Sequence, residues 1–169
     1  FHLVSRGYAE GFYRFPRVAY AMLKEAAQGD HLIALTACIG GTMAYDALSS
    51  AQRVKFDDLN HHLLSDGSLM RDVQRKMAAT FDRLEWAFGR ENVFLELQFN
   101  RLAAQNYVNR AMLEFARANS LTKQLVVAAD SHYPRPELWK EREIYKKLGW
   151  LNYAEVDASK LPSDASQLK

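Results

Sequence analysis

The sequence has very little of what would cross-link the chain or carry it through a membrane. Cys38 is the single cysteine among 169 residues, so an internal disulfide is impossible and a reducing, cytoplasmic setting is expected. No apolar run approaches the roughly 20 residues that a helix needs to cross a bilayer. Residues 1–6 lack the basic and then apolar layout of a signal peptide. These absences favour a cytoplasmic protein with no membrane partner.

An excess of charge of either sign is also missing. Lys and Arg number 22 against 20 Asp and Glu, which gives a formal net charge of +2. This balance does not indicate a strongly basic nucleic-acid binder, so a DNA contact would have to come from a local patch or another domain. Hydrophobic residues make up 49% of the chain, enough for one compact domain with a sizeable core. A serine nucleophile elbow, a phosphate-cradling glycine loop and a dinucleotide fingerprint are all absent.

Short apolar segments alternate with amphipathic ones along the chain. Apolar residues four or three positions apart indicate a helix over 73–88, which Gly89 ends. Strands are expected at 32–36, at 93–97 and in the run that ends at Asp130, and further helices at 18–26, 49–62, 102–115 and from 136 onward. Strands separated by helices of this length predict an α/β domain with a parallel sheet or barrel and helices outside it.

The most informative segment is the apolar run that ends in Asp130-Ser131-His132. Residues i and i+2 of a strand lie on the same side, so Asp130 and His132 are expected to project together where the strand meets its loop. A carboxylate and an imidazole held in this way are half of a divalent metal site. The alternative is a loop-capping Asp beside a partly buried His, and the residues alone leave both interpretations open.

Cys38 ends another expected strand, directly before Gly40 and Gly41. A lone cysteine in a cytosolic protein is more often a small buried hydrophobe than a metal ligand. The thiolate interpretation is strengthened here because Asp130 and His132 end a strand of the same kind. Cys, Asp and His together suit zinc or a similar transition ion.

Two other sets of ionisable residues are assigned simpler roles. Glu96 lies in an expected strand on the face opposite Leu95 and Leu97, where it would point into a barrel interior or pair with an Arg. A structural role is favoured over catalysis for this carboxylate. His61 and His62 lie in a polar stretch and are expected to be exposed to solvent.

Four sequence blocks, in this order, resemble one protein family. They are Glu10-Gly11-Phe12-Tyr13 within 8–17, Cys38-Ile39-Gly40-Gly41 within 32–41, Leu95-Glu96-Leu97-Gln98 followed by Gln105 and Val108-Asn109, and Asp130-Ser131-His132-Tyr133 within 127–133. The series resembles the PHP (polymerase and histidinol phosphatase) domain of the bacterial replicative DNA polymerase III alpha subunit over about residues 1–148.

The resemblance implies a fold and a metal site. The family's PHP domain is a distorted (β/α)7 barrel of the TIM-like kind, with a cluster of zinc or manganese ions at the carboxyl ends of its strands. Cys38, Asp130 and His132 match three ligand positions of that cluster, and no further catalytic residue is assigned. An intact cluster implies 3′–5′ exonuclease or phosphoesterase activity, whereas a decayed one implies a scaffold that docks a separate proofreading exonuclease.

The resemblance also implies what surrounds the chain. Residues 1–153 are expected to be the carboxy-terminal part of a PHP domain, and 154–169 the start of the connection to the polymerase domains. The parent would synthesise DNA from deoxynucleoside triphosphates with Mg²⁺ in a palm outside this chain, and would work with a sliding clamp. A fragment carrying only part of the ligand set is expected to be inactive by itself.

Some features depart from the family pattern. The upstream His-x-His motif is missing, the segment 42–67 is longer and more polar than expected, and Asn100 stands where many relatives carry a His. A divergent branch, such as a phage-encoded replicative polymerase, would accommodate these departures. A stand-alone PHP phosphatase is the remaining alternative, against which the blocks containing Gly11 and Glu96 argue because they resemble the polymerase branch.

Overall fold

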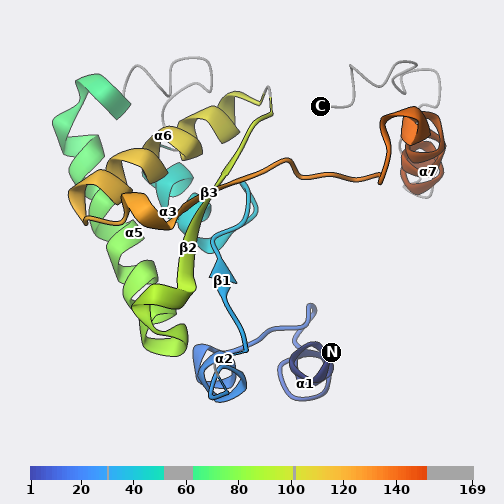
Figure 1. The fold of residues 1–169 in the computed structure, drawn as a ribbon, viewed down its shortest axis with the longest axis horizontal. Helices are drawn as coiled ribbons and strands as arrows, with labels where there is room; N and C mark the ends of the chain where they lie inside the picture. The colour runs from blue at the N-terminus through green and yellow to red at the C-terminus, as the bar shows by residue number, and fades with distance from the viewer. Residues whose placement is uncertain (30, 52–62, 101, 152–169) are drawn as a thin grey trace.

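The computed structural model describes residues 1–29, 31–51, 63–100 and 102–151. The elements in chain order are α1 (His2–Ala9), α2 (Tyr20–Ala26), β1 (Ala34–Leu35), α3 (Thr42–Ser50), α5 (Gly67–Phe88), η2 (Arg90–Asn92), β2 (Val93–Gln98), α6 (Ala103–Ala118), η3 (Thr122–Gln124), β3 (Leu125–Ala128), η4 (Pro136–Leu138) and α7 (Trp139–Leu151). Helices α5 and α6 lie beside the sheet, and α7 lies apart from it at the end of an extended segment (Figure 1). No helix among these described residues is both long and apolar enough to span a membrane.

The three strands form one parallel sheet in the order β1-β2-β3. Ala34 pairs with Val93, and Leu95 pairs with Leu125, so β2 is the central strand of the sheet. Because all three strands run the same way, their carboxyl ends meet at one edge. The α/β class and the parallel sheet are confirmed. The described residues form this small sheet and not a closed barrel.

The core lies between the central strand and three helices. Val93 and Leu95 of β2 are fully buried, and they pack in one cluster with residues of α3, α5 and α6. The rings of Phe81 and Phe115 join α5 to α6, with their centroids 5.7 Å apart. Burying a side chain of this size contributes about 1.5 to 3 kcal/mol, so these contacts fix the helices against β2.

The long helix α5 begins and ends where its sequence signals lie. Asp66 caps its amino terminus by accepting hydrogen bonds from the backbone N–H groups of Ser68 and Leu69, at 2.8 and 3.1 Å. Gly89 ends it with a φ of 81°, in the left-handed region that favours glycine. The predicted helix with Val73, Met77 and Phe81 on its buried face is therefore confirmed.

Helix α3 was not predicted. The sequence instead indicated a helix later in the chain, over 49–62. Met43, Ala44 and Ala47 of α3 are fully buried. They are one and three positions apart, so they lie on a single face of the helix. Two of these three side chains are only methyl groups, so the apolar signal in the sequence is weak. Residues 52–62, with His61 and His62, lie outside the described residues, as does the expected connection 154–169.

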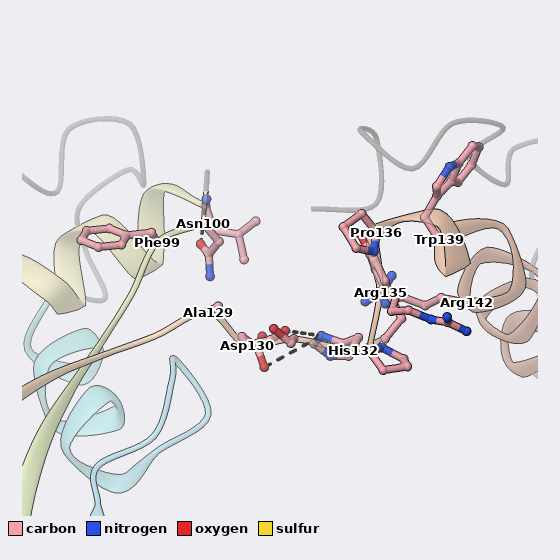
Figure 2. A pocket seen from close by; sticks show the side chains of 13 residues that line it. Phe99, Asn100, Ala129, Asp130, His132, Arg135, Pro136, Trp139 and Arg142 are labelled. Atoms are coloured by element: carbon pink, nitrogen blue, oxygen red, sulfur yellow. Dashed lines mark hydrogen bonds and ion pairs between the residues drawn. The ribbon is translucent and has the colours of Figure 1, made fainter.

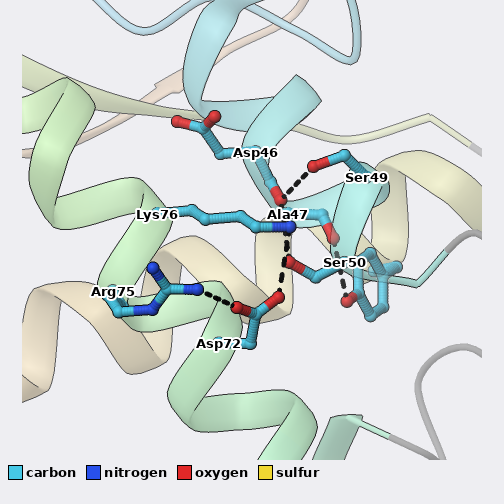
Figure 3. Close-up of polar contacts among 8 residues, drawn as sticks. Asp46, Ala47, Ser49, Ser50, Asp72, Arg75 and Lys76 are labelled. Atoms are coloured by element: carbon cyan, nitrogen blue, oxygen red, sulfur yellow. Dashed lines mark hydrogen bonds and ion pairs between the residues drawn. The ribbon is translucent and has the colours of Figure 1, made fainter.

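Polar contacts join α3 to α5 beside this core (Figure 3). The carboxylate of Asp72 lies 2.5 Å from Arg75 and 3.1 Å from Lys76. A hydrogen bond from the Ser50 side chain, followed by those from Arg75 and Lys76, lowers the pKa of Asp72 to about 2. Thr80 of α5 also donates a hydrogen bond to Asp46 Oδ2 of α3, at 2.5 Å, so polar contacts as well as apolar packing join the two helices.

Candidate metal site at the carboxyl edge of the sheet

Three loops leave the sheet at its carboxyl edge, one from each strand. Cys38 follows β1, Asn100 follows β2, and Asp130 follows β3. This edge is where ligands bind in open α/β sheets, because the loops diverge there and leave a crevice. The sequence-predicted residues therefore come from the first and third strands, with the central strand between them.

A cleft of about 600 Å³ opens at the β2–β3 side of this edge. Figure 2 shows Phe99 and Asn100 on one side, Asp130 and His132 in the middle, and the segment leading into α7 on the other side. The full lining is Phe99, Asn100, Leu102, Ala129, Asp130, Ser131, His132, Tyr133, Pro134, Arg135, Pro136, Trp139 and Arg142. The cleft thus combines a carboxylate and an imidazole with two guanidinium groups and several aromatic rings.

Asp130 and His132 are brought together, but by a turn and not by the strand. Strand β3 ends at Ala128, and Asp130 has a φ of 51°, a left-handed conformation that cannot continue a strand but that Asp tolerates. The prediction that the strand reaches Asp130 was therefore wrong by two residues. His132 Nδ1 lies 2.6 Å from the backbone oxygen of Asp130 and 3.9 Å from its Oδ1. Both side chains are about half exposed, at 52% and 51%.

The short contact to the carbonyl oxygen shows which ring nitrogen of His132 carries a proton. A carbonyl oxygen only accepts, so Nδ1 of His132 carries the proton and donates it to Asp130 O. This assignment follows from the hydrogen-bond geometry. In the neutral form of this ring the lone pair is on Nε2, which is the arrangement of a metal-ligating His whose other nitrogen donates to a backbone carbonyl.

Cys38 is a free, half-buried thiol in a tight turn before α3. The backbone N–H of Gly40 donates to Cys38 Sγ at 3.5 Å, and that of Gly41 donates to Cys38 O at 2.8 Å. A Cβ atom at Gly41 would lie 2.1 Å from Thr36 O, so only glycine fits there. Ala37 has a φ of 60°, an uncommon conformation for a residue with a side chain.

The structure does not gather Cys38 into one group with the other two residues. Among the residues that it describes, no three His, Cys, Asp or Glu side chains lie close enough to hold a metal ion. Neighbouring strands lie about 4.8 Å apart, so β1 and β3 are separated by roughly 10 Å across β2. Cys38 is also not one of the residues that line the cleft.

The central strand contributes buried polar residues that the sequence only partly indicated. The Glu96 carboxylate is buried and accepts a hydrogen bond from Gln98 Nε2 at 2.8 Å, so its partner is an amide and not the Arg that was one of two expected arrangements. The backbone N–H of Glu96 donates to Thr36 Oγ1 at 2.9 Å. The signal in the sequence is the alternation of Glu96 and Gln98 with apolar residues in a strand that is otherwise buried.

A second polar group lies between α6 and this edge. Gln105 Oε1 accepts a hydrogen bond from the backbone N–H of Ile39, next to Cys38, at 3.1 Å. Gln105 Nε2 donates to Asn109 Oδ1 at 2.9 Å, and Asn109 Nδ2 donates to Gln98 O at 2.8 Å. Residues of α6 therefore contact the Cys38 turn and the end of β2 together.

Comparison with known proteins gives one consistent result. No protein-family profile matches the chain. The chain is 34% identical over 142 residues to the DNA polymerase III subunit alpha of Thermus aquaticus, and 32% identical over 135 residues to that of Aquifex aeolicus. It is 31% identical over 147 residues to the subunit from Chlamydia muridarum. These matches cover 80% to 84% of this chain, but the chain spans only 9% to 11% of the length of these relatives.

Proposed function

We propose that this chain is a segment of a replicative DNA polymerase III alpha subunit. The similarity to such subunits over 80% to 84% of the chain supports the proposal. The parent protein would carry out template-directed DNA synthesis from deoxynucleoside triphosphates, with Mg²⁺ in a palm outside these residues.

Within that parent, we propose that the segment is the carboxy-terminal part of a PHP domain and contributes Cys38, Asp130 and His132 to a metal-dependent phosphoesterase site. The observation that carries this proposal is the Asp130–His132 pair, in which the 2.6 Å contact leaves Nε2 free to bind an ion. A carboxylate, an imidazole and a thiol are a donor set that suits zinc, and carboxylate and imidazole also suit manganese. The remaining ligands and the remaining barrel strands would come from other parts of the parent.

The residues of the cleft have distinct roles in this proposal. Asp130 and His132 Nε2 would bind the ion, while the Nδ1–H bond of His132 holds the ring in place. When bound, a divalent ion lowers the pKa of a coordinated water and offsets negative charge on a phosphodiester. Arg135 and Arg142, which line the same cleft, would attract the phosphates of a DNA 3′ end. The reaction would be 3′–5′ phosphodiester hydrolysis.

The metal content of the full-length parent tests this proposal. We expect stoichiometric zinc or manganese in the purified parent, and its loss in Cys38→Ala and His132→Ala variants together with loss of exonuclease activity on single-stranded DNA. Arg75→Gln is the matched control, since Arg75 is an exposed residue of α5 that pairs with Asp72. A parent that holds the same metal after both ligand substitutions would contradict the assignment.

A second candidate role is a scaffold that docks a separate proofreading exonuclease. The observation that favours it is that Cys38 does not form a group with Asp130 and His132 among the described residues. On this alternative, the parent would bind no metal outside its palm. Co-purification with an exonuclease subunit, together with unaltered proofreading in the Cys38→Ala variant, would support the scaffold role and contradict the catalytic proposal.

A further inference from the structure

We propose that Gln105 and Asn109 of α6 are positioning residues that hold the Cys38 turn against the carboxyl end of β2. The inference rests on the proposed role of Cys38 at the metal site. It concerns how one ligand is kept in place before any ion binds. The two residues are four positions apart on one helix, so their side chains lie on the same face.

Gln105 makes the contact to the Cys38 turn. Its side chain is fully buried, with 0% of its surface exposed. Its Oε1 accepts the Ile39 N–H at 3.1 Å, across 66 residues of sequence. A buried amide whose oxygen and nitrogen are both bonded to protein is held in one orientation. If either group were released, it would have neither a protein partner nor water to form a hydrogen bond with.

Asn109 makes the contact to the strand. Its Nδ2 donates to Gln98 O at 2.8 Å, and its Oδ1 accepts from Gln98 N at 3.3 Å. The side chain therefore binds both backbone groups of Gln98, the last residue of β2, as the backbone of a neighbouring strand would. The same Oδ1 accepts from Gln105 Nε2 at 2.9 Å, which joins the two contacts into one chain of hydrogen bonds.

These hydrogen bonds hold the backbone just beyond the point where the pairing of β1 with β2 ends. The pairing of β1 with β2 ends at Leu35 and Phe94, and Thr36 adds one more backbone bond, from its N–H to Phe94 O at 3.1 Å. The chain then bends through Ala37, with its φ of 60°. A left-handed conformation at a residue with a Cβ persists only where surrounding contacts hold it. The bond from Ile39 to Gln105 lies directly beyond this bend.

The test measures the Cys38 turn itself in the 169-residue chain, without metal or DNA. In a Gln105→Met variant the side chain keeps its length but no longer accepts from Ile39 or donates to Asn109. We expect amide hydrogen exchange at Ile39, and alkylation of Cys38 by iodoacetamide under native conditions, each to become about tenfold faster, as expected for losing one buried hydrogen bond.

Tyr107→Phe is the matched control on the same helix. The Tyr107 hydroxyl donates to Ala47 O of α3 at 3.2 Å, so this substitution also removes one buried bond to backbone but leaves the Cys38 turn alone. It is expected to lower the urea midpoint of unfolding with no change in the alkylation rate of Cys38. Asn109→Ala is a second variant, expected to speed exchange at Gln98.

Two outcomes would overturn the inference. One is a Gln105→Met protein that stays folded with unchanged exchange at Ile39 and unchanged alkylation of Cys38. The other is an equal acceleration in Tyr107→Phe, which would show that only overall stability controls the turn. Either result leaves the proposed metal site standing, because that proposal is tested by the metal content of the parent.

Discussion

The loop after β1 and the loop after β3 carry the two halves of the candidate site, and they are held in opposite ways. The Cys38 turn is half-buried and tied to a helix 66 residues away through Gln105. Asp130 and His132 are about half exposed, and the contact that joins them is between residues two positions apart. The first half is fixed by tertiary structure, whereas the second is fixed only locally and would gain most from a bound ion or a covering part of the parent.

The largest difference between the two halves should appear when the core is weakened. Leu95 is fully buried in the central strand, so Leu95→Ala is expected to lower the free energy of unfolding by about 2 to 5 kcal/mol. Val127, on β3 toward the second loop, is 62% exposed. Val127→Ala should change the unfolding free energy by less than about 1 kcal/mol. Urea denaturation of both variants checks this, and equal losses would contradict the difference in burial.

The tightness of the Cys38 turn is expected to give the next largest effect. A Cβ at Gly41 would lie 2.1 Å from Thr36 O, so Gly41→Ala must displace backbone and is expected to cost about 1 to 3 kcal/mol. At Gly40 the nearest atom to a Cβ is Cys38 Sγ, at 3.9 Å. Gly40→Ala is therefore the matched control and should unfold close to the wild-type urea midpoint. A tolerated Gly41→Ala would mean that the turn is looser than the 2.1 Å distance to Thr36 O implies.

The pH dependence of stability separates the helical support of the first loop from the second loop. The helices α3 and α5 that support the first loop contain the carboxylate of Asp72, whose pKa is lowered to about 2 by Ser50, Arg75 and Lys76. A lowered pKa in the folded state stabilises the fold above the ordinary value of 3.8, and this contribution is lost as the pH falls from 3.8 toward 2.

Substitution of Ser50 isolates that effect. Ser50→Ala should raise the pKa of Asp72 toward 3.8, because the Ser50 hydrogen bond is the largest cause of its shift. Ser49→Ala is the control, since the Ser49 hydroxyl donates to Asp46 O at 3.0 Å. An NMR titration of the Asp72 carboxyl carbon measures the pKa in each variant. If Asp72 has the same pKa in the Ser50→Ala and Ser49→Ala variants, Ser50 is not the cause of its lowered pKa.

The smallest effect is expected at the second loop. His132→Ala removes an exposed side chain whose bond is local, so the unfolding free energy of the isolated chain should change by no more than about 0.5 kcal/mol. Thermal and urea unfolding without metal are the measurements. A loss as large as that expected for Gly41→Ala would show that the two loops are held equally firmly.

The sequence predicted the elements whose pattern is long and regular. Helix α5 and strand β2 follow from the spacing of Val73, Met77 and Phe81 and from the apolar run that includes Leu95. These signals are local, so neighbouring residues alone are enough to define them. The parallel sheet followed from the alternation of such strands with helices.

What the sequence did not predict depends on contacts between distant residues. Helix α3 was missed because its buried face is made largely of alanine. The end of β3 was misplaced because the left-handed turn at Asp130 is a property of φ, which Asp allows but does not require. Gln105 and Asn109 look like the polar face of a helix, and only the folded chain shows that their side chains bind Ile39 and Gln98.

X-ray absorption at the zinc edge of the full-length parent, loaded with zinc, tests most directly whether the two loops contribute ligands to one metal site. We expect one sulfur scatterer at about 2.3 Å and nitrogen or oxygen scatterers near 2.0 Å, with the sulfur shell lost in Cys38→Ser and the imidazole contribution reduced in His132→Ala. A spectrum without sulfur in the wild-type parent would contradict a site shared by Cys38 and His132.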